Sequence, residues 1–152
     1  MQARMNFATA LPDATPAIKS MIGAAWKAGV APKTLHLVHM RISQINGCAV
    51  CLDGGAKQAR GHGESDERLF AVAGWRDAPY YTDAERAALA LAETVTRLSD
   101  REDAVPDAIW KEATRHFDEK ELAGLLLWIA TTNVFNRLNV ATRQVAGSVK
   151  WD

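Results

Sequence analysis

Apolar residues recur in this chain every three or four positions, which is the spacing of one face of an α-helix. Runs that alternate apolar and polar residues, the pattern of half-buried strands, are absent from the sequence. The pattern therefore predicts an all-α fold. Two of the expected helices span residues 16–28 and 32–46, and a third runs from Cys48 toward Gly63. Further helices are expected to begin near residues 65, 82, 106 and 118.

Three of the expected helix starts carry capping signals. Ser65 is a candidate N-cap. Thr82 with Glu85, and Asp118 with Glu121, form the capping-box pattern, in which side chains satisfy free backbone N–H groups. A connecting loop is expected over residues 75–81. The apolar stripes predict a core made of Ile18, Met21, Ile22, Ala25, Trp26, Leu35, Val38, Ile42, Ile45, Leu69, Phe70, Val72, Ala88, Leu91, Ala92, Val95, Leu98, Ile109, Trp110 and Ala113.

The last expected helix is the longest, and its middle is apolar on nearly all sides. This pattern predicts burial all round, because a helix with one solvent face keeps polar residues there. In a chain this small we expect a second subunit to complete that burial. The apolar positions concerned are Leu122, Leu125, Leu126, Ile129, Val134, Leu138 and Val140.

Length and composition favour one folded domain. The chain has 152 residues, of which 48% are hydrophobic and 24% charged, which is ordinary globular usage. The formal net charge is zero, whereas a nucleic-acid surface needs an excess of Lys and Arg. We therefore expect no nucleic-acid partner.

No segment predicts membrane insertion or secretion. The most apolar stretch, Leu122–Ala130, is much shorter than the roughly 18 residues of a membrane span. Met1–Leu11 lacks the apolar core of a secretory signal. We therefore expect a cytoplasmic protein without a membrane partner, in which a disulfide would be transient and catalytic rather than structural.

Cys48 and Cys51 stand three residues apart, directly after an Asn46-Gly47 turn. In the first turn of a helix this spacing brings both sulfurs to one face, close enough to form a disulfide. The free N–H groups and the dipole of a helix start stabilise a thiolate, which is the nucleophile toward peroxides and disulfides. The pair is therefore the candidate reaction centre.

Two other interpretations of the pair stay open. The cysteines can be buried without any chemistry. Alternatively, His36 and His39 on the preceding helix can join Cys48 and Cys51 in a Cys₂His₂ zinc site, if the turn between the two helices is short enough.

The run Leu37–Asp53 resembles the core signature of the alkylhydroperoxidase AhpD-like / carboxymuconolactone decarboxylase family. Other family motifs have counterparts in Ala59-Arg60 with Gly63-Glu64, Ala73–Pro79, Thr82–Leu91 and Thr132–Leu138. The resemblance covers residues 35–144 and implies one AhpD-like domain over 1–152, with 1–14 and 146–152 as terminal segments. It further implies an all-helical fold, homo-oligomers that are commonly trimers or hexamers, and thiol peroxidase or disulfide-exchange chemistry.

The family's site is written E-x₁₁-C-x-x-C-x₃-H, and this chain departs from it twice. The cysteines fall on Cys48 and Cys51, the glutamate on His36 and the histidine on Gly55. An imidazole at 36 can still take and relay a proton near neutral pH, whereas glycine at 55 removes the base after the second cysteine. The family pattern makes Cys51 the peroxide-reacting thiol and Cys48 the resolving one, although the helix dipole alone favours a thiolate at Cys48.

Replacement bases are available nearby. His39 lies one turn from His36, whereas His62 is expected too far along its helix to reach the second cysteine within one subunit. Ser43 and Asn46 are candidates for hydrogen bonds near the thiols. We interpret the remaining polar and aromatic candidates as structural residues of the core or of an interface: Asn133, Asn136, Arg137, Trp26, Trp75, Trp110, Trp128 and Trp151.

The sequence thus predicts a thiol-dependent peroxidase and disulfide-exchange protein with Cys48, Cys51, His36 and His39 as catalytic residues. The expected partners are a peroxide substrate, a lipoyl or thioredoxin-like dithiol reductant, and further copies of the chain. No cofactor and no metal are expected. The alternative is a non-catalytic redox-sensing or partner-binding oligomer that has lost turnover. Lactone decarboxylation fits poorly, because that branch of the family works without a cysteine pair.

Overall fold

The computed structural model describes residues 1–149, and within this range the chain is all-helical, with no β-strand. The prediction of fold class is confirmed. The helices are α1 (Phe7–Ala10), α2 (Ala14–Trp26), α3 (Pro32–Asn46), α4 (Ala49–Gly61), α5 (Asp66–Ala71), the 3₁₀ turn η1 (Val72–Gly74), α6 (Asp83–Thr96), α7 (Asp107–His116) and α8 (Glu119–Ala141). The short α1 has no counterpart among the predicted helices. In the described part of the chain, no helix is both long enough and apolar enough to cross a bilayer.

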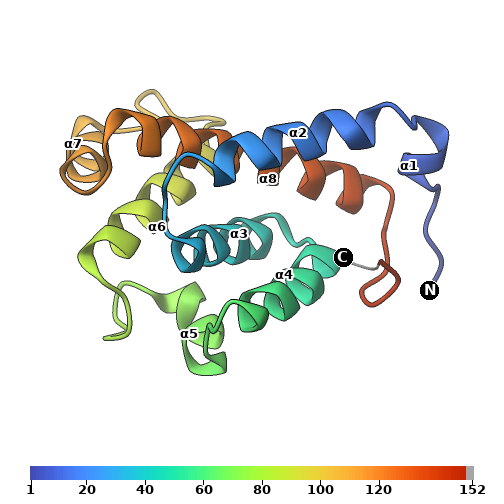
Figure 1. The fold of residues 1–152 in the computed structure, drawn as a ribbon, viewed down its shortest axis with the longest axis horizontal. Helices are drawn as coiled ribbons and strands as arrows, with labels where there is room; N and C mark the ends of the chain where they lie inside the picture. Colours follow the sequence, from blue (N-terminus) through green and yellow to red (C-terminus); the bar gives the residue numbers. More distant parts are fainter. Residues whose placement is uncertain (150–152) are drawn as a thin grey trace.

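Helix α3 lies at the centre of the fold (Figure 1). It packs against α4, α6 and α8, while α2 lies along α8 on the other side of the bundle. Every residue from Thr34 to Met40 is buried, because one apolar cluster packs against α3 from α2, α6 and α8 and a second from α4, α5 and α6. His36 and His39 therefore belong to an interior helix and not to a solvated surface.

The predicted helix starts are confirmed at atomic detail. Thr82 and Asp118 each accept a hydrogen bond from the backbone N–H three residues on, and Glu85 and Glu121 complete both capping boxes. Ser65 caps α5 through Arg68 N–H. These caps satisfy N–H groups that a helix start otherwise leaves free.

Five of the predicted core positions are exposed. Phe70 is 76% exposed on the outer side of the short α5, and Leu98 lies beyond the end of α6, so the helical spacing no longer places it inward. Val134 and Val140 of α8 are 39% and 45% exposed. The all-round burial predicted for the last helix is therefore incomplete in the single chain. Trp110, on α7, is 40% exposed.

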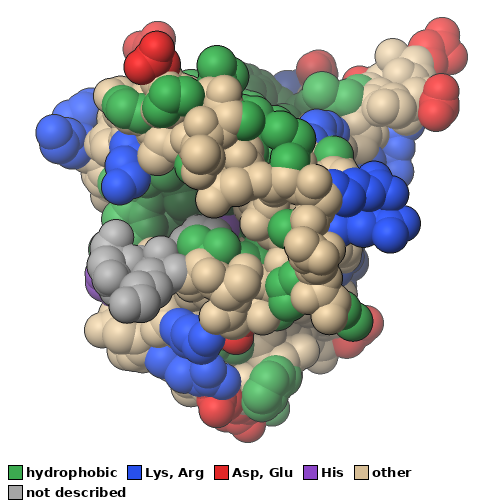
Figure 2. All heavy atoms as spheres, turned by 90° about the vertical axis from the view of Figure 1, so that its right-hand side faces the viewer, with side chains coloured by type: hydrophobic (Ala, Val, Ile, Leu, Met, Phe, Trp, Pro, Cys, Tyr) green, Lys and Arg blue, Asp and Glu red, His purple; other side chains and the backbone are tan. Residues whose placement is uncertain are grey.

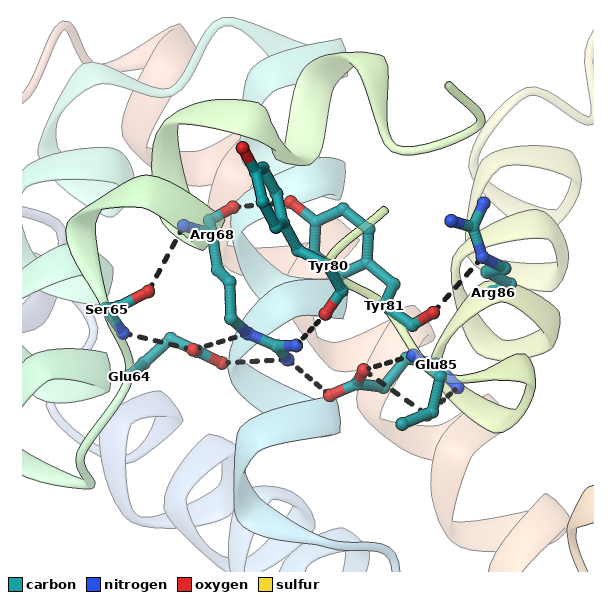
Figure 3. A network of polar contacts seen from close by, with 8 residues as sticks. Glu64, Ser65, Arg68, Tyr80, Tyr81, Glu85 and Arg86 are labelled. Atoms are coloured by element: carbon teal, nitrogen blue, oxygen red, sulfur yellow. Dashed lines mark hydrogen bonds and ion pairs between the residues drawn. The ribbon is translucent and has the colours of Figure 1, made fainter. Parts of the chain in front are cut away.

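A polar cluster fixes the segment between α5 and α6 (Figure 3). The guanidinium of Arg68 bridges Glu64 and Glu85, and the Tyr81 hydroxyl donates to the Arg68 carbonyl. Arg86 donates to the Tyr81 carbonyl and to carbonyls at 75, 76 and 78. The loop predicted over 75–81 is thus held by charge-assisted bonds, which are stronger than neutral ones.

Gly124 permits the close approach of α2 and α8. A Cβ atom at this position would lie 2.1 Å from the Ala28 Cβ and 3.1 Å from the Ala25 carbonyl oxygen. We expect Gly124→Ala to lower the free energy of unfolding by about 1–3 kcal/mol, the usual cost of overpacking. Gly23→Ala is the matched control, because a Cβ there meets no atom within 4 Å. It should raise stability by up to about 1 kcal/mol through helix propensity. Urea denaturation of both variants measures the difference, and equal effects would contradict the close contact.

Candidate active site

The two cysteines stand at a sharp junction between α3 and α4. Gly47 adopts the left-handed conformation with φ 67° and ψ 31°, and its N–H bonds back to the last turn of α3. Cys48 is the N-cap of α4, and its own N–H donates to the Ser43 carbonyl at 3.0 Å. The Asn46-Gly47 turn therefore ends one helix and begins the next, as predicted, and it places Cys51 in the first turn of α4.

Cys48 and Cys51 form a disulfide, with their Cα atoms 5.3 Å apart. The predicted closeness of the two sulfurs is confirmed. Both residues are buried, with 1% and 0% of their surface exposed. Val50 and Phe135 complete a small apolar cluster around them. A polar environment is nevertheless present, so the pair is not sealed into a purely apolar interior.

Two polar side chains from other helices reach Cys51. The Asn139 side chain of α8 donates from Nδ2 to the Cys51 Sγ at 3.4 Å. His39 of α3 bonds through Nε2 to the Cys51 carbonyl oxygen at 3.1 Å. A donor to sulfur favours the thiolate form once the disulfide is reduced. Sequence reasoning missed Asn139, although it lies three residues after Asn136 and hence on the same face of α8.

An asparagine network holds the turn that precedes Cys48. Asn46 donates from Nδ2 to the side-chain oxygens of Asn133 at 2.9 Å and Asn136 at 3.0 Å, and Asn136 in turn donates to Ser43. Asn133 also donates to the side chain of Thr96. These buried amides are thereby paired, as buried polar groups require. The prediction that Asn133 and Asn136 are structural hydrogen-bonding residues is confirmed, and the network ties the cysteine turn to α8.

The glycine at the family's histidine position faces His39. A Cβ atom on Gly55 would lie 2.6 Å from His39 Cδ2 and 2.8 Å from His39 Nε2. The imidazole of α3 thus fills the space into which a side chain from position 55 of α4 would project. Gly55 therefore makes room for the His39 ring.

His36 pairs with His62, which sequence reasoning placed far from the site. The two rings lie 4.8 Å apart, and His36 Nε2 is 3.0 Å from His62 Nδ1. Burial, together with the neighbouring His62 and His39, lowers the pKa of His36 to about 4. The expectation that His36 exchanges protons near neutral pH is therefore not supported. Burial also lowers the pKa of His39. The hydrogen bond to the Cys51 carbonyl raises this pKa, but by less than burial lowers it.

The structure gives no geometric support to the zinc alternative. The two sulfurs are bonded to each other, His39 Nε2 is bonded to a carbonyl and His36 to His62. Across residues 1–149, no three His, Cys, Asp or Glu side chains are placed to hold one metal ion.

A small surface cavity leads to one of the two cysteines. It measures about 140 Å³ and is lined by Cys48 together with its neighbours in α4 and by Asn139 and Arg143. Cys51 does not line it and lies deeper, beside His39 and Phe135. The two cysteines therefore differ in their surroundings, because Cys48 borders this cavity and Cys51 does not.

Comparisons with known proteins find a matching family and relatives that cover most of the chain. Residues 12–94 match the carboxymuconolactone decarboxylase family. The uncharacterised protein YdfG of Bacillus subtilis (strain 168) is 30% identical over 148 residues, which cover 97% of this chain and 99% of YdfG. The uncharacterised protein YnjA of Escherichia coli (strain K12) is 34% identical over 110 residues, which cover 72% of this chain and 59% of YnjA.

Solved structures share the fold. ATU0492 of Agrobacterium tumefaciens, a protein of unknown function described as a candidate antioxidant defence protein AhpD, has a TM-score of 0.90 at 31% identity and covers 97% of this chain and 100% of its own. A variant of the debrominase Bmp8 in complex with 2,3,4-tribromopyrrole has a TM-score of 0.79 at 19% identity. The match covers 92% of this chain and 74% of Bmp8, and it shows a common fold alone. With its AhpD-like fold and its cysteine pair at the start of α4, this chain belongs to the carboxymuconolactone decarboxylase family.

Proposed function

We propose that this protein is a thiol–disulfide oxidoreductase that reduces hydroperoxides with Cys51 and Cys48. The observation that carries the proposal is the disulfide at the first turn of α4, with the Asn139 side chain donating to the Cys51 sulfur. The free N–H groups at a helix start and this donor both favour a thiolate at the reduced pair. A purely structural disulfide between residues this close would constrain very little chain, because the stabilisation grows with the length of the closed loop.

The reaction consumes one peroxide for each disulfide formed. The Cys51 thiolate attacks the terminal oxygen of the hydroperoxide, so that an S–O bond forms, the O–O bond breaks and the alkoxide takes up a proton to leave as an alcohol. Cys51 is then a sulfenic acid. The Cys48 thiolate attacks its sulfur, the disulfide forms and hydroxide leaves with a proton as water. A dithiol then reduces the disulfide and is itself oxidised.

The two sulfurs suit different steps. Cys48 lines the surface cavity of about 140 Å³, so an incoming dithiol would attack that sulfur, and Cys51 would be released as the leaving thiolate. Asn139 donates to the Cys51 sulfur and so stabilises this leaving group. A lipoyl or thioredoxin-like dithiol is the expected reductant. His39, which is bonded to the Cys51 carbonyl, is proposed to position that residue against α3.

We also propose a homo-oligomer, either a trimer or a hexamer. Val134 and Val140 remain exposed on α8, although the apolar pattern of this helix predicts burial. Another copy of the chain packed on this face would cover them. Sedimentation equilibrium of the purified protein measures the number of subunits.

The activity is tested by following thiols and peroxide together. The reduced protein should lose two thiols per hydroperoxide consumed, as the balanced reaction requires, and should turn over when dihydrolipoamide is supplied. Dihydrolipoamide without protein is the control for the uncatalysed reaction. Loss of thiols without peroxide consumption, or no acceleration over the control, would contradict the peroxidase proposal.

A further inference from the structure

A second cavity, larger than the one at Cys48, lies between α2, α3, α4 and α8. Its volume is about 460 Å³, which is within the range of small-molecule sites. Figure 2 shows the corresponding face hollowed, with hydrophobic side chains around the hollow and histidine at its floor. The rings that line the cavity are Trp26, His36, His39, His62, Trp128 and Phe135.

These rings form a connected aromatic wall. Trp26 meets Trp128 edge-on with centroids 5.7 Å apart, and His39 stacks on Trp128 at 5.9 Å. Trp26 also meets His36 edge-on at 5.2 Å. The exposed faces and edges of such a wall can pack against a flat aromatic guest in the arrangements that aromatic pairs prefer. Trp26, which the sequence indicated as a core or interface residue, packs against the core and also lines this cavity.

Two rings of this wall carry a buried polar atom without a partner. Among the described residues, four buried side-chain polar atoms lack a hydrogen bond, and two of them are Trp26 Nε1 and His39 Nδ1. An unpaired buried polar group costs free energy, and an apolar side chain at the same position would avoid that cost. Both atoms belong to side chains that line one cavity, which points to a bound molecule as the missing partner.

The hydrogen-bonding character of both atoms follows from their surroundings. The indole Nε1 of Trp26 can only donate. The Nε2 of His39 is bonded to the Cys51 carbonyl, which can only accept, so Nε2 carries the proton. In the neutral ring, His39 Nδ1 is then an acceptor. The guest must provide an acceptor for Trp26 and a donor for His39, and a hydroxyl group has both.

The charges around the cavity favour an uncharged guest over a cationic or an anionic one. Lys19 is the cation at this cavity, and none of the described residues that line it is acidic, so a cationic guest gains no counter-charge. The exposed Lys19 offers positive charge to an anion, but an anion placed at His39 Nδ1 would meet the lone pair of that atom. Burial keeps the pKa of His36 and His39 low, so both rings are neutral at pH 7 and supply no positive charge for an anion.

We propose that this cavity binds small, uncharged aromatic molecules that carry a hydroxyl group, with the ring against Trp26 and Trp128 and the hydroxyl bonded to Trp26 Nε1 and His39 Nδ1. The cavity borders the redox pair, because His39 bonds to the Cys51 carbonyl and Phe135 packs against the disulfide. Occupancy is therefore expected to alter access to Cys51. The binding itself requires no redox step.

The test compares naphthol with naphthalene by calorimetric titration of the oxidised protein. Naphthol should bind about tenfold more tightly, because two hydrogen bonds add to the same ring contacts. Trp26→Phe keeps a ring but removes the donor, so the preference for naphthol should fall to about threefold or less. Trp110→Phe is the matched control, because Trp110 lies on α7 outside the cavity, and it should leave the preference unchanged.

Equal affinity of the two probes, or a preference that Trp26→Phe leaves intact, would overturn the proposal, and so would the absence of saturable binding of either probe. No peroxide or thiol is present in these titrations. A protein that binds naphthol but does not consume peroxide would retain this inference and lose the proposed function. A protein that consumes peroxide but does not bind naphthol would retain the proposed function and lose this inference.

Discussion

Replacing Cys51 with serine is expected to abolish hydroperoxide reduction. A serine hydroxyl is not ionised at pH 7 and is a far weaker nucleophile than a thiolate, so the attack on the O–O bond is lost. We expect the rate to fall on the order of a thousandfold or more, as when other enzymes lose their nucleophile. Stopped-flow measurement of peroxide consumption by the reduced variant checks this.

Cys48→Ser is the matched variant, because it also removes the disulfide but leaves the attacking thiol. It should consume one peroxide per subunit and then stop, with Cys51 held as a sulfenic acid that mass spectrometry detects as one added oxygen atom. If Cys51→Ser instead retained the single turnover and Cys48→Ser did not, the attacking thiol would be Cys48, as the helix dipole alone suggests.

The cysteine site could be predicted from the sequence because its geometry is local. Cys48 and Cys51 lie within one turn of helix, and the Asn46-Gly47 turn before them has a strong conformational preference. The capping boxes at Thr82 and Asp118 were predictable for the same reason. In each case the interacting groups are close in sequence, so no knowledge of helix packing was needed.

The histidine arrangement could not be predicted, because it depends on how α3 and α4 pack. Spacing alone places His62 far along its helix from the cysteines and His36 one turn from His39. It does not reveal that His62 lies beside His36, or that His39 enters the space above Gly55. Nor does the sequence indicate that α3 is buried over the whole of 34–40, which is what lowers the pKa of both α3 histidines.

Any side chain added at Gly55 would collide with the His39 ring. Gly55→His is the most informative substitution, because it places a histidine at the family's position. From the sequence alone, a large gain in peroxidase rate on this substitution would indicate that the chain is disabled by the loss of its histidine. The structure leads us to expect no such gain, because even the Cβ atom would lie 2.6 Å from the His39 ring. We expect Gly55→His to lower the free energy of unfolding by about 3 kcal/mol, at the upper end of overpacking, without a gain in rate. Urea denaturation and the peroxidase assay measure the two effects.

Gly61→His controls for placing histidine on the same helix, since a Cβ at Gly61 meets no atom within 4 Å, and it should change stability little. Combining Gly55→His with His39→Ala moves the imidazole from α3 to α4 and removes the clash. The two changes should therefore be strongly non-additive, with the double variant more stable than Gly55→His alone. If Gly55→His is as stable as the unaltered protein and reduces peroxide faster, then His39 does not occupy that space and the chain simply lacks its base. A stable, more active double variant would instead show that one imidazole, placed from either helix, serves the same position beside Cys51.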